Sequence, residues 1–253
     1  MSLRLRLIAR LDVKNDTVVK GIHLEGLRVV GKPFDLAKKY ADQGADEILY
    51  MDAVASLYDR NNLVDIVSRT SADIFIPVTV GGGIRTLDDI ETLLHSGADK
   101  VAMNTAAIRR PEFISEAANR FGSQCIVLSV EAKRIACGKW EAYVDTGREP
   151  TGKDVVIWAK QAVDLGVGEV LVTSIDHEGT KNGTEIELVK SIVDAVPVPV
   201  IASGGVGTVQ HVVDVVRNCR VNAVASASLF HYDICSFPEL KSALSTQGIR
   251  TRT

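Results

Sequence analysis

The feature that most constrains the fold of this chain is an internal duplication. The segment IPVTVGGGI, which ends at Ile84, aligns with VPVIASGGV, which ends at Val206. Two further pairs of segments, DEIL with GEVL and KVAMNT with AVASAS, keep that offset or nearly keep it. Three matches in register are hard to explain as chance resemblance between ordinary strand–helix units. The sequence therefore predicts two fused halves of the same design.

Short β-branched runs alternate with amphipathic stretches along the chain, which is typical of parallel sheets covered by helices. A helix is expected at 33–43, where Gly44 supplies a left-handed stop. Eight strands each followed by a helix favour a closed barrel, because doubly wound sheets carry about five or six strands. We therefore predict a single α/β domain over residues 1–253, a (β/α)8 TIM barrel built from two half-barrels. The predicted strands are Leu5–Leu11, Glu47–Asp52, Phe75–Val80, Lys100–Asn104, Cys125–Glu131, Glu169–Ser174, Val198–Ser203 and Ala223–Ala227.

Composition excludes several classes of function. A formal net charge of -3 gives no general attraction to nucleic acid or to an anionic membrane surface. No apolar run approaches the ~20 residues needed to cross a bilayer, and the N-terminus lacks the apolar core of a signal peptide, so we expect a cytoplasmic protein. The 4 cysteines and 5 histidines show no metal-ligand spacing. We expect neither a metal nor another cofactor.

Polar residues follow the predicted strands at the end where barrel enzymes carry their active sites. Asp12 and Glu131 end matching strands of the two halves, and Asp52 and Asn104 end two others. Opposed carboxylates over a pocket can act as a general acid and a general base. The alternative is that such acids only cap or brace the loops.

Two glycine-rich turns, Gly81–Gly83 and Ser203–Gly205, follow the third and the seventh strand. Glycine lets backbone N–H groups approach an anion, and the next helix adds its positive N-terminal end. Each turn could be an ordinary tight turn. Their duplication, with hydroxyls one strand later at Thr105 and Ser228, favours two phosphate cradles. The sequence thus predicts a ligand with two phosphates that spans the mouth of the barrel.

Two other regions stand out, the connection after the first strand and the beginnings of four strands. The connection from Val13 to Lys32 is long for a strand–helix link, and we expect a binding loop or lid from which Lys20 reaches the substrate. Four charged residues stand near the beginnings of strands, where they either face solvent or pair as a ring. These four residues are Arg6, Glu47, Lys100 and Glu169.

From Arg6 to about Leu244 the chain resembles the family of cyclase subunits of imidazole glycerol phosphate synthase, HisF, of histidine biosynthesis. The blocks that carry the resemblance include LDVKNDTVVKG, PVTVGGGIRTLDD, GADKVAMNTAA, LVTSIDHEGTKNG, PVIASGGVG and ASASLFH. The resemblance implies a carbon–nitrogen lyase. Such an enzyme uses ammonia to convert phosphoribulosyl-formimino-aminoimidazole carboxamide ribonucleotide into imidazole glycerol phosphate and aminoimidazole carboxamide ribonucleotide. It also implies a heterodimer with a HisH-like glutaminase subunit.

The resemblance assigns roles to individual residues. Asp12 and Glu131 would be the catalytic carboxylates, with Lys20 in the active-site loop. The four charged residues at the strand starts would form the ammonia gate, and Asp99 would lie in the glutaminase interface. The residues that would bind the substrate and its phosphates are Gly83, Asn104, Thr105, Thr173, Glu178, Gly179, Ser203, Gly205, Ala227 and Ser228.

Three residues depart from the family pattern, which has Cys at Arg10 and Asp at both Glu131 and Glu178. A guanidinium next to Asp12 could pair with it or change its protonation. One added methylene displaces a carboxylate by about an ångström, which can cost ~100-fold in rate. Two alternatives therefore remain open. One is a paralogue that delivers nitrogen to another acceptor, such as a surface-polysaccharide sugar. The other is a catalytically silent subunit that binds phosphate or activates a glutaminase.

Overall fold

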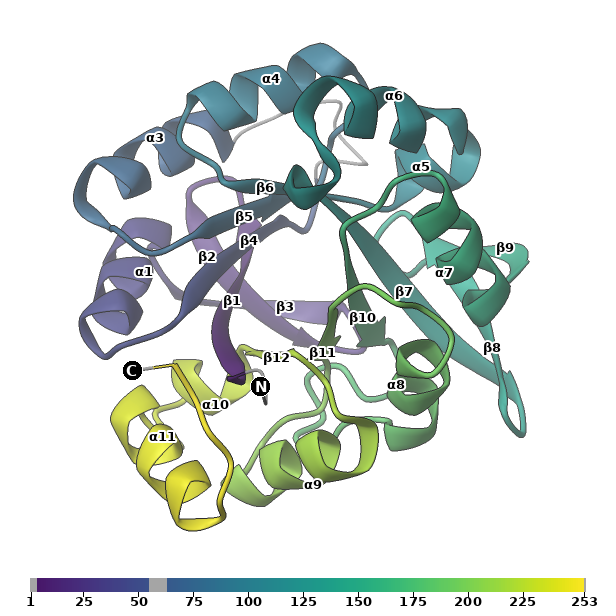
Figure 1. The fold of residues 1–253 in the computed structure, drawn as a ribbon. Helices are drawn as coiled ribbons and strands as arrows, with labels where there is room; N and C mark the ends of the chain where they lie inside the picture. Colours follow the sequence, from purple (N-terminus) through teal and green to yellow (C-terminus); the bar gives the residue numbers. More distant parts are fainter. Residues whose placement is uncertain (1–3, 55–62, 253) are drawn as a thin grey trace.

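The computed structural model describes residues 4–54 and 63–252, and they form a closed barrel of parallel strands with helices around it (Figure 1). Each strand pairs with the next one along the chain, and the last strand pairs with the first, which closes the barrel. The predicted (β/α)8 architecture is confirmed. The barrel strands are β1 (Arg6–Lys14), β4 (Glu47–Asp52), β5 (Val78–Gly81), β6 (Lys100–Met103), β7 (Ile126–Ala136), β10 (Glu169–Ser174), β11 (Val200–Ser203) and β12 (Ala223–Ser226).

Helices separate these strands and pack against the outside of the barrel (Figure 1). Two short helices, α5 (Thr105–Arg109) and α10 (Ser228–His231), begin one residue after the ends of β6 and β12, and a short 3-10 helix, η1 (Ser123–Cys125), precedes β7. Within the described residues no helix is both long and apolar enough to span a membrane. The longer helices are α1 (Pro33–Asp42), α3 (Leu63–Asp73), α4 (Leu87–His95), α6 (Glu112–Phe121), α7 (Val155–Asp164), α8 (Ile186–Val193), α9 (Val209–Cys219) and α11 (Phe237–Thr246).

The predicted strand bounds are correct for β4 and β10 and shifted elsewhere. Both β5 and β11 begin later than expected, directly after Pro77 and Pro199. A proline has no N–H to donate to a neighbouring strand, so the ladder starts at the following residue. Phe75, which we assigned to β5, lies outside the strand and is 91% exposed.

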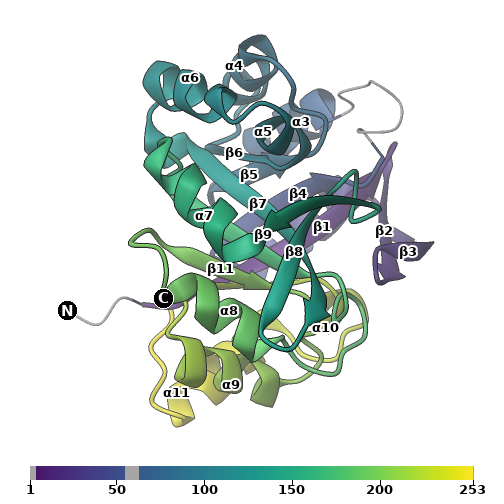
Figure 2. The same cartoon turned by 90° about the vertical axis from the view of Figure 1, so that its right-hand side faces the viewer.

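The long connection after β1 is not the irregular loop that the sequence suggested. It forms an antiparallel hairpin of β2 (Thr17–Ile22) and β3 (Glu25–Gly31), and β2 continues the sheet from β1. A second hairpin, β8 (Lys139–Val144) and β9 (Glu149–Asp154), extends β7 in the same way. Figure 2 shows both hairpins extending from the barrel. Each half of the barrel therefore carries one such hairpin.

The interior of the barrel is layered because alternate residues of each strand point inward. On β1 the inward residues are Arg6, Ile8, Arg10 and Asp12, from the N-terminal end to the C-terminal end. The middle layer is apolar, which separates a charged end from a polar mouth. This layer consists of Ile8, Leu49, Ala102, Val127, Leu171, Ile201, Ala223 and Ala225.

Candidate active site

Asp12 and Glu131 lie at the C-terminal end of the barrel on opposite strands, and each is 7% exposed. The Asp12 carboxylate accepts a hydrogen bond from Arg10 Nε at 2.8 Å and contacts Lys20 Nζ at 3.4 Å. Glu131 Oε2 accepts from Asn104 Nδ2 at 3.0 Å and from the Gly147 N–H at 2.7 Å. The two carboxyls thus have different neighbours, cations for Asp12 and neutral donors for Glu131.

These neighbours set the two pKa values in opposite directions. Burial raises the pKa of Asp12, but the Arg10 and Lys20 charges outweigh it and hold this pKa below its ordinary value. Burial raises the pKa of Glu131 to about 7, although Arg10 and the Gly147 N–H partly offset the effect. At neutral pH Asp12 is a carboxylate, whereas a large fraction of Glu131 carries a proton.

Lys20 is held in place by charge. It lies on β2, is 4% exposed, and forms an ion pair with Glu178 besides its contact with Asp12. The β2–β3 hairpin is also fixed through its backbone, because the His23 N–H donates to the Glu178 carbonyl at 2.8 Å. The sequence predicted that Lys20 reaches the mouth, and the structure places it there as part of an ordered hairpin.

The cradle of the first half opens into a cavity of about 310 Å³. Gly82 and Gly83 adopt φ values of 96° and 74°, which side-chain-bearing residues rarely adopt. A Cβ on Gly82 would lie 2.6 Å from the Asp52 carbonyl oxygen, so the turn requires glycine. Asn104 and Thr105 line the same cavity. Further lining residues that the sequence did not single out include Arg85, Arg109, Arg110, Ser129, Asp145 and Thr146.

The cradle of the second half borders a smaller pocket than the cradle of the first half. Gly205 has φ 86°, and a Cβ there would lie 2.0 Å from the Gly183 carbonyl oxygen. Arg10 lies beneath this cradle, and its Nη1 donates to Thr173 Oγ1 at 2.9 Å and to Ser203 Oγ at 3.0 Å. The other predicted binding residues around this cavity are Glu178, Gly179, Ala227 and Ser228.

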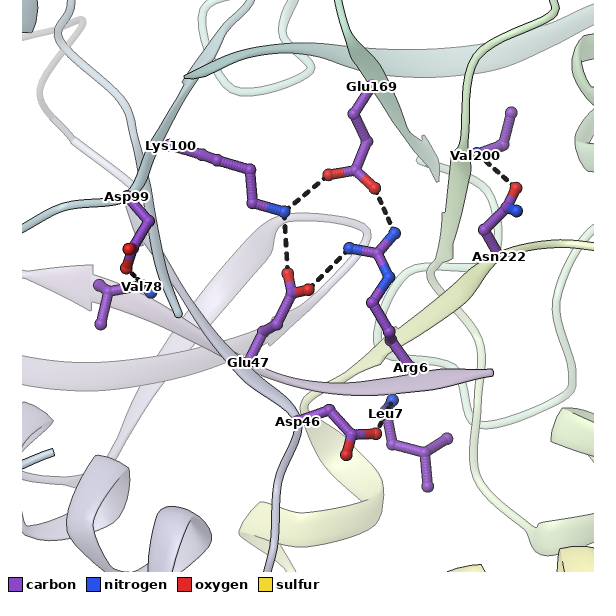
Figure 3. Close-up of polar contacts among 10 residues, drawn as sticks. All are labelled: Arg6, Leu7, Asp46, Glu47, Val78, Asp99, Lys100, Glu169, Val200 and Asn222. Atoms are coloured by element: carbon purple, nitrogen blue, oxygen red, sulfur yellow. Dashed lines mark hydrogen bonds and ion pairs between the residues drawn. The ribbon is translucent and has the colours of Figure 1, made fainter. Parts of the chain in front are cut away.

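The opposite end of the barrel is closed by a ring of four charged side chains (Figure 3). Arg6 pairs with Glu47 at 2.7 Å and also with Glu169. Lys100 Nζ pairs with Glu47 at 3.0 Å and with Glu169 at 2.8 Å. Every member therefore contacts two members of opposite charge. The alternative that these side chains merely face solvent is wrong, because the Arg6, Glu47 and Glu169 residues are at most 8% exposed.

Asp99 lies next to this ring and is exposed. Its Oδ2 accepts a hydrogen bond from the Val78 N–H at 2.8 Å (Figure 3). Asp46 Oδ2 likewise accepts a hydrogen bond from the Leu7 N–H at 2.7 Å, at the start of β1. Asp99 thus anchors the start of β5 at the N-terminal end of the barrel. Within residues 4–54 and 63–252, no three His, Cys, Asp or Glu side chains gather as a metal site.

Comparison with known proteins identifies the family of this chain. The family model described as histidine biosynthesis protein matches residues 6–236. The imidazole glycerol phosphate synthase subunit HisF of Legionella pneumophila is 60% identical over 205 residues, which cover 81% of this chain and 97% of that protein. The chain belongs to the histidine biosynthesis protein family.

Proposed function

We propose that this protein is the cyclase subunit of an imidazole glycerol phosphate synthase. Its substrate would be phosphoribulosyl-formimino-aminoimidazole carboxamide ribonucleotide, and ammonia the second reactant. The products would be imidazole glycerol phosphate and aminoimidazole carboxamide ribonucleotide. The observation that carries the proposal is the pair of buried carboxyls, Asp12 and Glu131, whose pKa values are shifted in opposite directions at the mouth of the barrel. The similarity to the Legionella protein supports it.

Ammonia addition and ring closure require protons to be both removed and supplied. Asp12, held as a carboxylate by two cations, fits the role of general base. Glu131, with a pKa of about 7, fits the role of general acid that protonates a leaving group. Asn104 holds Glu131 in place and has a buried Oδ1 without a hydrogen-bond partner. That oxygen is free to accept a hydrogen bond from a nitrogen of the substrate.

The charged ring fits an entrance for ammonia. Its four side chains close the N-terminal end, and the apolar layer behind it would admit a small neutral molecule more readily than an ion. A glutaminase subunit docked on this end, around Asp99, would release ammonia directly above the ring. The ring would then open by breaking one ion pair, for example that of Lys100 with Glu47.

The test is a turnover assay with the purified protein, the bisphosphorylated substrate and ammonium chloride at mildly alkaline pH. Formation of imidazole glycerol phosphate supports the proposal. The Asp12→Asn variant should fold normally and lose turnover, whereas Asp16→Asn, an exposed acid on the same segment, should behave as the wild type. No product in the wild-type reaction would refute the proposed reaction.

One observation favours a second candidate, a related synthase that delivers nitrogen to a different acceptor. Arg10 pairs with Asp12 and donates a hydrogen bond to Ser203 of the second cradle. A guanidinium beside the carboxylate proposed as the base distinguishes this site from the family pattern, which has Cys at this position. Turnover of a phosphorylated sugar with ammonium, in the absence of activity on the nucleotide substrate, would identify this candidate.

A further inference from the structure

One side chain joins Asp12 to the second cradle. Arg10 bonds to Asp12, and it also donates to the hydroxyls of Thr173 and Ser203, which end the neighbouring strands β10 and β11. We propose that Arg10 is a positioning residue for the second cradle, where its guanidinium fixes these two hydroxyls as donors toward a phosphate group of the substrate. This role rests on the proposed function, whose substrate brings a phosphate to each cradle.

The hydrogen bonds between Arg10 and the two hydroxyls have a fixed direction. A guanidinium carries N–H donors and no acceptor, so both hydroxyl oxygens must accept. Arg10 Nη1 lies 2.9 Å from Thr173 Oγ1 and 3.0 Å from Ser203 Oγ, and its two hydrogens can serve one oxygen each. In the part of the chain that the structure describes, neither hydroxyl donates to a protein group. Each hydroxyl therefore keeps its own hydrogen for a ligand.

Burial keeps this arrangement in place. Arg10 is 4% exposed, and Thr173 and Ser203 are each 1% exposed, so bulk water does not compete with the guanidinium as their donor. The bond from Arg10 Nε to Asp12 Oδ1 at 2.8 Å also fixes the orientation of the planar guanidinium. A cysteine at this position, as in the family pattern, has one weak S–H donor and could not serve both hydroxyls. The donor arrangement is thus a consequence of arginine at position 10.

The pocket beside the second cradle contains a further hydroxyl that suits an anion. The turn Ser203–Gly205 and Arg10 line this pocket. Ser226 lines it as well, and its Oγ is buried and has no hydrogen-bond partner among the described residues. Buried hydroxyls are nearly always hydrogen-bonded, so the Ser226 O–H is suited to donate to a ligand in the pocket. An acceptor-rich group placed here would meet the hydroxyls of Ser203 and Ser226 as donors.

The charges around the pocket also suit an anion. Glu178 lines the pocket, but its carboxylate forms an ion pair with Lys20. Lys181 lines the pocket too, with its Nζ 5.0 Å from the centre of the Tyr232 ring, and it adds a positive charge. Hydrogen bonds to a charged acceptor are stronger than those to a neutral one, so phosphate gains more from these donors than a neutral hydroxyl group would.

Titration with inorganic phosphate, followed by proton–nitrogen NMR of the backbone amides, tests this role in each cradle separately. The Gly205 N–H reports on the second cradle, and the Gly83 N–H reports on the first. Arg10→Met should weaken phosphate binding at Gly205 by about 10-fold or more, which is the loss expected when hydrogen bonds to a charged group are weakened. The same variant should change binding at Gly83 much less.

A double-mutant cycle separates hydroxyl positioning from a loss of charge. The Thr173→Val/Ser203→Ala background lacks both hydroxyls, so the effect of Arg10→Met on phosphate binding at Gly205 should become several-fold smaller there. Lys20→Met is the matched control. It removes a buried positive charge from the same cluster, but the ion pairs of Lys20 are with Asp12 and Glu178 and involve no hydroxyl. Lys20→Met should therefore weaken binding by the same factor in both backgrounds.

An equal factor for Arg10→Met in the two backgrounds would overturn the proposal, because Arg10 would then act through its charge or touch the anion itself. A Gly205 amide that does not respond to phosphate in the wild type would also overturn it. If Arg10→Met fails to fold, Arg10→Lys provides the same cycle, since it keeps the positive charge but lacks the planar fork that serves the carboxylate and both hydroxyls.

The measurement does not depend on turnover, so it separates this role from the proposed reaction. A protein that shows the expected coupling between Arg10 and the hydroxyls but makes no imidazole glycerol phosphate would refute the cyclase alone. Turnover with equal Arg10→Met factors in the two backgrounds would refute the role of Arg10 alone.

Discussion

Glu131 should make the protein less stable as the pH rises, and replacing it with glutamine should remove this effect. The residue is 7% exposed, and burial raises its pKa from the ordinary 4.5 to about 7. In the unfolded chain the carboxyl ionises near pH 4.5, whereas in the folded protein it keeps its proton until about pH 7. The folded state therefore binds more protons than the unfolded state between these two values.

The sign and the size follow from linkage. A group whose pKa is raised by folding contributes stability that is fully present below its unfolded pKa and is lost as pH rises through its folded pKa. A rise from 4.5 to about 7 corresponds to roughly 3 kcal/mol, at about 1.4 kcal/mol per pKa unit. Relative to Glu131→Gln, the free energy of unfolding of the wild type should fall by about 3 kcal/mol between pH 4 and pH 8.

Urea unfolding of both proteins across this pH range, followed by the fluorescence of the buried Trp140 and Trp158, measures the difference. Comparing the two proteins cancels the titration of the other groups that they share. Asn104 and the Gly147 N–H can bond to a glutamine oxygen as they do to the carboxylate, so the variant should keep the local structure. A difference in unfolding free energy that stays constant with pH would refute the assigned environment of Glu131.

Three further predictions concern the reaction and the gate. Turnover per unit of free ammonia should decline as pH rises through about 7, because Glu131 loses its proton there, and a flat profile would argue against its role as the acid. Asp12→Asn should lower kcat by about 10²–10⁴-fold with an unchanged circular dichroism spectrum, and a smaller loss would exclude it as the base. Glu47→Gln should lower the free energy of unfolding by about 3–5 kcal/mol, since Arg6 and Lys100 both lose a buried partner. Urea unfolding measures the change, and an unchanged midpoint would show that the four side chains do not form a closed ion-pair network.

Sequence patterns predicted the barrel because its signals are local and repeated. Each half carries alternating strand and helix patterns, and residues at strand ends share one rim in any parallel barrel. Asp12, Glu131 and Asn104 could thus be placed together without coordinates. The hairpins were missed although β2 and β3 contain β-branched residues, as in TVVKG and RVV. Their length and their position between a strand and a helix suggested a loop instead.

The contacts of Arg10 could not be predicted from spacing. Its place two residues before Asp12 on β1 puts both side chains on one face, which suggests their ion pair. Its bonds to Thr173 and Ser203 join residues separated by 163 and 193 positions. They depend on the width of the barrel interior and on the side-chain rotamer. Neither contact follows from the spacing of residues along the chain.

The charges in the mouth explain why Arg10 and a protonated Glu131 occur together. Arg10 and Lys20 supply two buried positive charges, and Asp12 and Glu178 supply two negative ones. Glu131 is the fifth ionisable side chain of this cluster. When Glu131 carries its proton, the net charge of the five buried side chains is close to zero. A phosphate bound in the first cradle would add negative charge on the side of Asn104 and Glu131, which would raise the pKa of Glu131 further. Substrate binding would therefore strengthen the acid form at the moment when a proton donor is required.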